Sequence, residues 1–202
     1  LLRAPGGCPW YRAQTHRSIR SNMLEEAYEA AEAIDRMDMA NLKEELGDVL
    51  LQVVFHARMA QEAGRFTFDD VVDGVCRKLV YRHPHVFGTA DASGPEGALA
   101  AWDAQKRAEK GQSTTADAMD SVAQALPALA RAAKLQGKAA KAGFDWRGPS
   151  PALDKLCEEL EELKTALREG SNVEEELGDL LFAAVKVGRS AQVDGEEALQ
   201  KA

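Results

Sequence analysis

The sequence predicts an all-α fold built as two related helical-bundle domains in tandem. Ala, Leu, Glu and Lys, which favour helices, are abundant, while aromatic residues make up only 6% of the 202 residues. Apolar residues recur at the three- and four-residue spacing of amphipathic helices. One acidic pattern also occurs twice along the chain. Together these observations favour paired helices over a sheet.

The first half of the chain should begin irregularly and then form two long helices. Residues 1–15, rich in Gly and Pro, are expected to be irregular. A helix is predicted over residues 17–37, and a second over 39–62. The expected buried stripe of the first helix consists of Ile19, Met23, Ala27, Ala30 and Ile34. Residues 46–55 are apolar nearly all round, which predicts a buried helix. One helical neighbour cannot cover that surface, so we expect a homodimer.

Further helices and turns follow in alternation. Helices are predicted at about 69–83, 96–110, 126–143, 152–169, 172–191 and from 195 onwards. Segments rich in Gly, Pro, Ser and Thr separate them. The predicted domains are 1–112 and 117–202, with a flexible loop or linker within 88–116. The second domain is expected to lack a C-terminal tail.

The chain repeats itself. "EEAYE" (25–29) matches "EELEE" (158–162), 133 residues later. "EELGDVL" (44–50) matches "EELGDLL" (175–181), 131 residues later. Arg58 follows Asp48 by ten residues, as Arg189 follows Asp179. Two diverged copies of one helical unit explain this better than a solenoid, which needs about three or more repeats.

Each copy carries four carboxylates at helical spacing. Residues three apart lie on one side of a helix, so two packed helices bring the four together. They are Glu26, Glu29, Glu45 and Asp48 in the first copy, and Glu159, Glu162, Glu176 and Asp179 in the second. A solvated acidic face would be the simpler interpretation of either run alone. The repetition favours a site, and clustered carboxylates need a counter-charge. Oxygen ligands suit Mg²⁺, with Mn²⁺ as an alternative.

Composition excludes several classes of protein. The net charge of −8 argues against binding a nucleic-acid polymer. The three cysteines form neither a zinc spacing nor a disulfide framework, and we find no segment of membrane-spanning length. We therefore expect a cytoplasmic protein without a membrane partner.

Several motifs, in this order, resemble the MazG family of nucleoside triphosphate pyrophosphohydrolases. They are "GCPW" with "QTH", "LEEAYE", "EELGDVLLQVVFHARMA", "KLVYRHPHVFG", "LPALARAAKLQ", "GFDW" and "EEELGDLLFA". The resemblance implies an all-α fold that dimerises through its helices. It also implies Mg²⁺-dependent hydrolysis of a nucleoside triphosphate to the monophosphate and pyrophosphate, a step that would serve nucleotide-pool house-cleaning.

Carried over by position, the resemblance assigns roles to residues of both copies. The eight carboxylates named above become metal ligands. Glu25 and Glu158, the first Glu of each motif, sit beside the sites, so the catalytic candidates are Glu25, Glu26, Glu158 and Glu159. The phosphate-binding candidates are Arg58, Lys78, Arg82, Lys186 and Arg189. The candidates for stacking the base are Trp10, Phe66, Trp102 and Trp146. Because the second copy lacks the counterpart of "KLVYR", we expect the first site to retain more activity.

Two other interpretations of the acidic helices are a di-iron site and a non-catalytic module. A di-iron carboxylate bundle needs Glu-x-x-His on two helices, and here the motif is Glu-x-x-Asp. The non-enzymatic alternative is a helical regulatory or interaction module with degenerate metal sites. Intact sets of four carboxylates favour the enzyme, and release of pyrophosphate separates the two classes.

Overall fold

The described part of the chain is all-helical, which confirms the predicted fold class. The computed structural model describes residues 1–146 and 148–202, and within them it contains helices and no strand. The chain divides into two compact units, Leu1–Ala98 and Leu99–Ala202, called here the N-terminal and C-terminal units. The predicted domain boundary between residues 112 and 117 lies further along the chain and stays a prediction.

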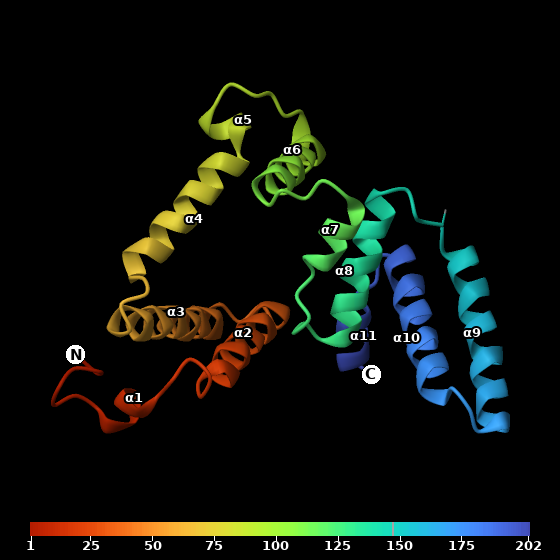
Figure 1. The fold of residues 1–202 in the computed structure, drawn as a ribbon, viewed down its shortest axis with the longest axis horizontal. Coiled ribbons are helices and arrows are strands. Elements are labelled where there is room, and N and C mark those ends of the chain that lie inside the picture. Colours follow the sequence, from red (N-terminus) through yellow and green to blue (C-terminus); the bar gives the residue numbers. More distant parts are fainter. Residues whose placement is uncertain (147) are drawn as a thin grey trace. The chain divides into compact units, whose positions relative to one another are not determined.

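The N-terminal unit is built on a pair of long helices. Its helices are α1 (Pro9–Ala13), α2 (Arg20–Asp35), α3 (Met39–Glu62), α4 (Phe68–Arg82) and α5 (Pro84–Phe87). α2 packs against α3, and α4 packs against the far end of α3 (Figure 1). The side chain of Asp38 caps α3 by accepting hydrogen bonds from two backbone N–H groups, each at 3.1 Å. A capping box between Thr67 and Asp70 starts α4. These caps fix where the two helices begin.

A small apolar core anchors the N-terminal segment to α3. Ile19, Phe55 and Met59 are each at most 6% exposed, and Tyr11 packs against them. The ring centroids of Tyr11 and Phe55 lie 5.0 Å apart. The guanidinium of Arg3 lies over the Phe55 ring at 5.6 Å from its centroid. The segment before α2 is therefore held by specific contacts, although it was predicted to be irregular.

The C-terminal unit contains the second copy of the repeat. α6 (Gly94–Glu109) starts before the division between the units. The other helices are α7 (Thr115–Asp120), α8 (Ala128–Lys141), α9 (Pro149–Glu169), α10 (Val173–Ser190) and α11 (Gly195–Gln200). α9 and α10 lie side by side and antiparallel, and α8 packs on α10 (Figure 1). Ala152, Ala166 and Ala183 are buried, and such small side chains let helices approach closely.

The tight turn between α9 and α10 places the second acidic cluster. Gly170 ends α9 in the left-handed conformation at φ 68°, which glycine adopts without steric cost. α10 then begins with three glutamates in its first turn, Glu174, Glu175 and Glu176. Negative charge is favourable at a helix N-terminus. The turn returns the chain along α9, so Glu176 lies beside it.

Some local predictions differ from the structure. The short helices α1, α5 and α7 lie in segments predicted to be irregular or turns. In the predicted stripe of α2, Ile19 and Ala30 are buried, but Met23 and Ile34 are 39% and 56% exposed and Ala27 is also exposed. The reason is that α2 packs mainly on one neighbour, α3, which covers only part of its apolar face.

The prediction that residues 46–55 form a buried helix is wrong for the single chain. Leu46 and Leu50 are 54% and 56% exposed, whereas Gln52 and Phe55 are buried. In the second copy Leu181 is similarly exposed, at 48%. α3 and α10 therefore present apolar faces that the described chain leaves uncovered. Among the described residues, we find no helix long and apolar enough to cross a membrane.

Candidate functional site

The first acidic cluster lies where α2 meets α3. Carboxylate oxygens of Glu26, Glu29 and Glu45 all lie within 4.8 Å of one another. Glu26 and Glu29 are three residues apart on α2, which puts them on one side of that helix. Glu45 projects from the second turn of α3. We call these three residues the first cluster.

Desolvation and neighbouring charges raise the pKa of two members of this cluster, Glu26 and Glu45. Desolvation raises the pKa of Glu26, the hydrogen bond from Gln52 partly offsets it, and the charges of Asp48 and Glu29 raise it further. Desolvation also raises the pKa of Glu45, as do the charges of Glu29 and Asp48. Asp48, the fourth predicted ligand, is not one of the three converging residues, but its charge still affects Glu26 and Glu45.

Gln52 contacts this cluster, although it is not among the site residues predicted from the sequence. Its Nε2 donates a hydrogen bond to Oε1 of Glu26 at 3.2 Å, and the residue is 7% exposed. Its own Oε1 is buried and has no hydrogen-bond partner in the described part of the chain. A signal existed in the sequence, because Gln52 is an amide inside an apolar run, one helical turn after Asp48. Ala183 stands at the matching position of the second copy.

The second acidic cluster lies between α9 and α10. Carboxylate oxygens of Glu159, Glu176 and Asp179 all lie within 4.8 Å of one another, and Glu159 is only 7% exposed. We call these three residues the second cluster. Glu162, the fourth predicted ligand, is outside the closest triad. A hydrogen bond with Glu159 raises the pKa of Glu162, and desolvation adds to this effect.

Lys155 pairs with the second copy's glutamates, a contact that the sequence analysis also missed. Its Nζ lies 2.7 Å from Oε1 of Glu158 and 2.8 Å from Oε1 of Glu159. These hydrogen bonds raise the pKa of Lys155. The spacing of three and four residues on one helix was a readable signal. In the first copy, Asn22 stands 133 residues earlier at the matching position.

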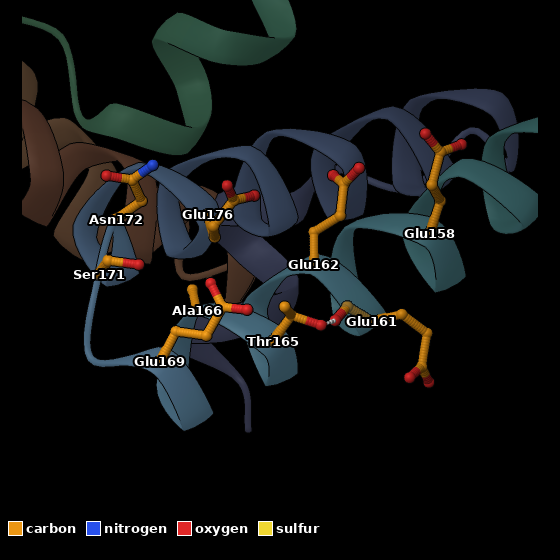
Figure 2. A pocket seen from close by; sticks show the side chains of 9 residues that line it. All are labelled: Glu158, Glu161, Glu162, Thr165, Ala166, Glu169, Ser171, Asn172 and Glu176. Carbon is orange, nitrogen blue, oxygen red and sulfur yellow. Dashed lines mark hydrogen bonds between the residues drawn. The ribbon is translucent and has the colours of Figure 1, made fainter.

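Two cavities adjoin the second cluster. Figure 2 shows the first, an acidic groove of about 570 Å³ between the C-terminal half of α9 and the start of α10. In it Glu158 and Glu162 project to the same side of α9, whereas Glu161 points away (Figure 2). Glu176 lines this groove from α10. The groove is therefore walled mainly by carboxylates and polar groups.

The second cavity joins the carboxylates to an apolar wall. It measures about 700 Å³, and Glu159 and Asp179 are among the residues that line it. Phe144, Trp146 and Phe182 contribute its aromatic wall. Of the four aromatic residues considered for stacking a base, Trp146 lines this cavity. The lining of this cavity therefore combines aromatic side chains with carboxylates of the second cluster.

Two of the predicted phosphate-binding residues are held by Asp145. Nη2 of Arg189 contacts both carboxylate oxygens of Asp145, at 2.7 and 2.8 Å. Nζ of Lys186 also pairs with Asp145 and lies 5.6 Å from the centroid of the Trp146 ring. Lys186 is 7% exposed and lines the aromatic cavity. Its recorded ion pair is thus with Asp145 rather than with a carboxylate of the second cluster.

The remaining predicted site residues belong to the N-terminal unit. Arg58 pairs with Glu62 at 2.9 Å, one turn along α3. Lys78 is exposed on α4, and Arg82 is 7% exposed at its end. Glu25 is exposed on α2, next to the first cluster. No described contact joins Arg58 or Lys78 to the first cluster.

Both clusters fit a hard divalent cation. Each offers three carboxylates whose oxygens already converge, without a sulfur or imidazole donor among them. Mg²⁺ and Mn²⁺ prefer oxygen ligands, whereas softer metals favour sulfur or nitrogen. Desolvation, together with neighbouring carboxylates, raises the pKa of Glu26 and of Glu45, and a bound cation would favour their ionised forms.

Comparisons with known proteins agree with the repeat and its motifs. The family model of the MazG nucleotide pyrophosphohydrolase domain matches residues 14–87 and again residues 147–202. A nucleoside triphosphate pyrophosphohydrolase of Escherichia coli (strain K12) is 45% identical over 206 residues, covering 100% of this chain and 78% of that protein. The match to the Thermotoga maritima nucleoside triphosphate pyrophosphohydrolase/pyrophosphatase MazG is 46% identical over 201 residues, covering 100% of this chain and 76% of that one.

Among solved structures, a crystal structure of a mazG-related protein from Thermotoga maritima is similar to half of this chain. It has a TM-score of 0.44 and 29% identity, covering 50% of this chain and 89% of that one. The match to the family model and the two relatives that align with the whole of this chain confirm the resemblance drawn from the motifs. This chain therefore belongs to the MazG nucleotide pyrophosphohydrolase domain family and carries the domain twice.

Proposed function

We propose that the chain hydrolyses nucleoside triphosphates to the monophosphate and pyrophosphate in a reaction that depends on Mg²⁺ or Mn²⁺. The observation that carries this proposal is the pair of converging carboxylate clusters, each on two packed helices. The names of the Escherichia coli and Thermotoga maritima relatives support the reaction class. A proposed physiological task is to clear unwanted nucleotides from the pool.

The carboxylates of each cluster would hold the cation. These are Glu26, Glu29 and Glu45 with Asp48 nearby, and Glu159, Glu176 and Asp179 with Glu162 nearby. When bound, the cation would neutralise charge on the triphosphate and polarise its phosphorus–oxygen bonds.

The first glutamate of each motif would orient the attacking water. The oxygen of water forms a bond to the α-phosphorus while the α–β bridging bond breaks, and pyrophosphate carries that bridging oxygen away. The proton of the water passes to a carboxylate, for which Glu25 and Glu158 are the candidates. Lys155 fixes Glu158 at 2.7 Å, which gives this carboxylate a defined position. Positioning of this kind is a large part of catalysis in phosphoryl transfer.

The aromatic cavity would hold the nucleoside in the second copy. Ligand cavities are commonly lined by apolar side chains with a few polar groups among them, and this cavity has such a lining. A base against Trp146 and Phe182 would leave the phosphates near Glu159 and Asp179. Lys186, which lines the same cavity, is paired with Asp145 beside Trp146 and would have to leave that ion pair to contact the phosphates.

A homodimer is part of the proposal. Leu46 and Leu50 on α3, and Leu177 and Leu181 on α10, are each 45% or more exposed. Large exposed apolar faces on monomers mark interaction surfaces. A second copy of the chain would cover these faces by helix packing.

Loss of turnover on removing both clusters tests the proposal. The double variant Glu45→Gln, Glu176→Gln keeps the side-chain volumes but removes one carboxylate from each triad. We expect pyrophosphate release from the wild-type chain with Mg²⁺, none with a chelator, and a large loss in the double variant. Glu32→Gln is the matched control, because Glu32 is an exposed α2 glutamate paired with Arg36 outside the cluster. A folded wild-type chain that releases no pyrophosphate from any triphosphate would favour the non-catalytic module instead.

A further inference from the structure

The two acidic clusters differ in their internal counter-charge. The motif "KLCEE" (155–159) in the second copy aligns with "NMLEE" (22–26) in the first. Lys155 contacts Glu158 and Glu159 at 2.7 and 2.8 Å. Asn22, at the matching position, brings no charge. The first cluster therefore has no counterpart of Lys155 at this position.

The contact of Lys155 with Glu159 is not an ordinary surface pair. Glu159 is 7% exposed and belongs to the second cluster. Lys155, Glu159 and Asp179 line the same cavity. A lysine four residues before a glutamate is also the less favourable order for stabilising a helix. Helix stability thus explains this pair poorly, and its position against a metal-binding carboxylate needs another reason.

We propose that Lys155 is a built-in counter-cation of the second cluster, which competes with the divalent cation for Glu159 and so sets the metal affinity of that site. The inference rests on the proposed metal-dependent function and deepens it. Lys155 acts through Glu159 and is a positioning residue. It holds the buried carboxylate in place before a cation arrives, at the cost of weaker metal binding.

The consequence is an asymmetry between the two copies. At the position of Lys155 the first copy has the neutral Asn22. Desolvation, to which the neighbouring carboxylates add, raises the pKa of both Glu26 and Glu45. A divalent cation that enters the first cluster meets a neutral amide, Asn22, at the position of Lys155. A cation that enters the second must displace Nζ of Lys155 from Glu159. The second copy is therefore expected to need a higher metal concentration.

Mn²⁺ binding, measured without nucleotide, tests this inference. Free Mn²⁺ is followed by electron paramagnetic resonance while metal is titrated into the chain. The second site is isolated in a Glu45→Gln background, where Lys155→Met removes the charge and Lys155→Arg keeps it. The first site is isolated in a Glu176→Gln background, where Asn22→Lys adds the charge. Circular dichroism checks that each variant is folded.

The side chain of Lys155 is still about one-third exposed, so water screens its charge and the expected changes are modest. We expect Lys155→Met to bind Mn²⁺ roughly two- to fivefold more tightly than its parent, and Lys155→Arg to stay close to the parent. Asn22→Lys should weaken binding at the first site by a similar factor, because its spacing to Glu25 and Glu26 is the same.

Two results would overturn the inference. Only the second of them would also overturn the proposed metal-dependent function. If the Glu45→Gln parent binds Mn²⁺ and Lys155→Met binds it equally or more weakly, Lys155 does not compete with the metal, although the proposed function survives. If neither the wild-type chain nor any variant binds Mn²⁺, the metal-dependent function fails and the inference fails with it.

Discussion

Replacing Gln52 by Glu should turn a stabilising contact of the first cluster into a repulsive one. In the wild-type chain Nε2 of Gln52 donates to Oε1 of Glu26 at 3.2 Å. Gln52→Glu has nearly the same shape but puts a carboxylate oxygen where the amide nitrogen lies. Two carboxylates this close, one of them on a residue that is 7% exposed, cannot both stay ionised without a counter-charge.

The size of the penalty is limited by protonation. The ordinary pKa of a glutamate such as Glu26 is 4.5, which is about 2.5 units below pH 7. Protonating such a carboxylate at pH 7 costs about 3.4 kcal/mol, at about 1.36 kcal/mol per pH unit, and this cost is the upper limit of the penalty. Glu26 is only half-buried, and water screens part of the repulsion, so we expect the variant to lose about 1–3 kcal/mol of stability at pH 7. The folded variant then binds more protons than the unfolded chain. The penalty is therefore absent below pH 4.5 and grows as the pH rises.

Urea unfolding of the wild-type chain, Gln52→Glu and Gln52→Met at pH 4.5 and pH 7.5 measures this effect. Gln52→Met removes the hydrogen bond and the unpaired Oε1 without adding charge, so its stability should change little between the two pH values relative to wild type. Saturating Mg²⁺ should restore part of the stability of Gln52→Glu. Equal stability of Gln52→Glu and Gln52→Met at both pH values would refute the contact with Glu26.

Three further predictions concern other parts of the chain. Burial lowers the pKa of His56 from 6.5, and the neighbouring His16 lowers it further, because the two Nδ1 atoms lie only 2.8 Å apart. As the pH falls, His56 is therefore protonated in the unfolded chain before it is protonated in the folded chain. Thermal stability should then fall as the pH drops from 7.5 to 5.5, and fall less in His56→Gln. Sedimentation should show a dimer at micromolar concentration, weakened about tenfold or more by Leu50→Glu; a stable wild-type monomer would count against the uncovered α3 face as an interface. Asp48→Asn should cost more turnover than Asp179→Asn at saturating Mg²⁺, and the reverse order would give the second site the larger share.

The repeat and the helix pairing could be predicted from the sequence, because helical spacing and two copies of one pattern constrain them strongly. The carboxylates of Glu26, Glu29 and Glu45 meet as expected, since spacing along a helix fixes which side chains share a face. The short helix α7 was missed although Thr114 and Asp117 form a capping box whose spacing is visible in the sequence. Its Ser- and Thr-rich surroundings suggested a break instead.

Contacts between helices could not be predicted in the same way. That Gln52 hydrogen-bonds Glu26 depends on how α3 rotates against α2, which periodicity alone does not determine. That Asp145 holds both Lys186 and Arg189 depends on the path of the chain after α8. The burial of residues 46–55 was overestimated because apolar composition predicts that a face will be covered, without saying whether the same chain covers it.

The most direct test of the central claim follows the oxygen of water during the reaction. The wild-type chain is given a nucleoside triphosphate and Mg²⁺ in water enriched in ¹⁸O, and the first products are analysed by ³¹P nuclear magnetic resonance. Our account predicts a nucleoside monophosphate that carries the ¹⁸O label and unlabelled pyrophosphate, because water attacks the α-phosphorus. A nucleoside diphosphate with labelled orthophosphate, or label in the pyrophosphate, would contradict it.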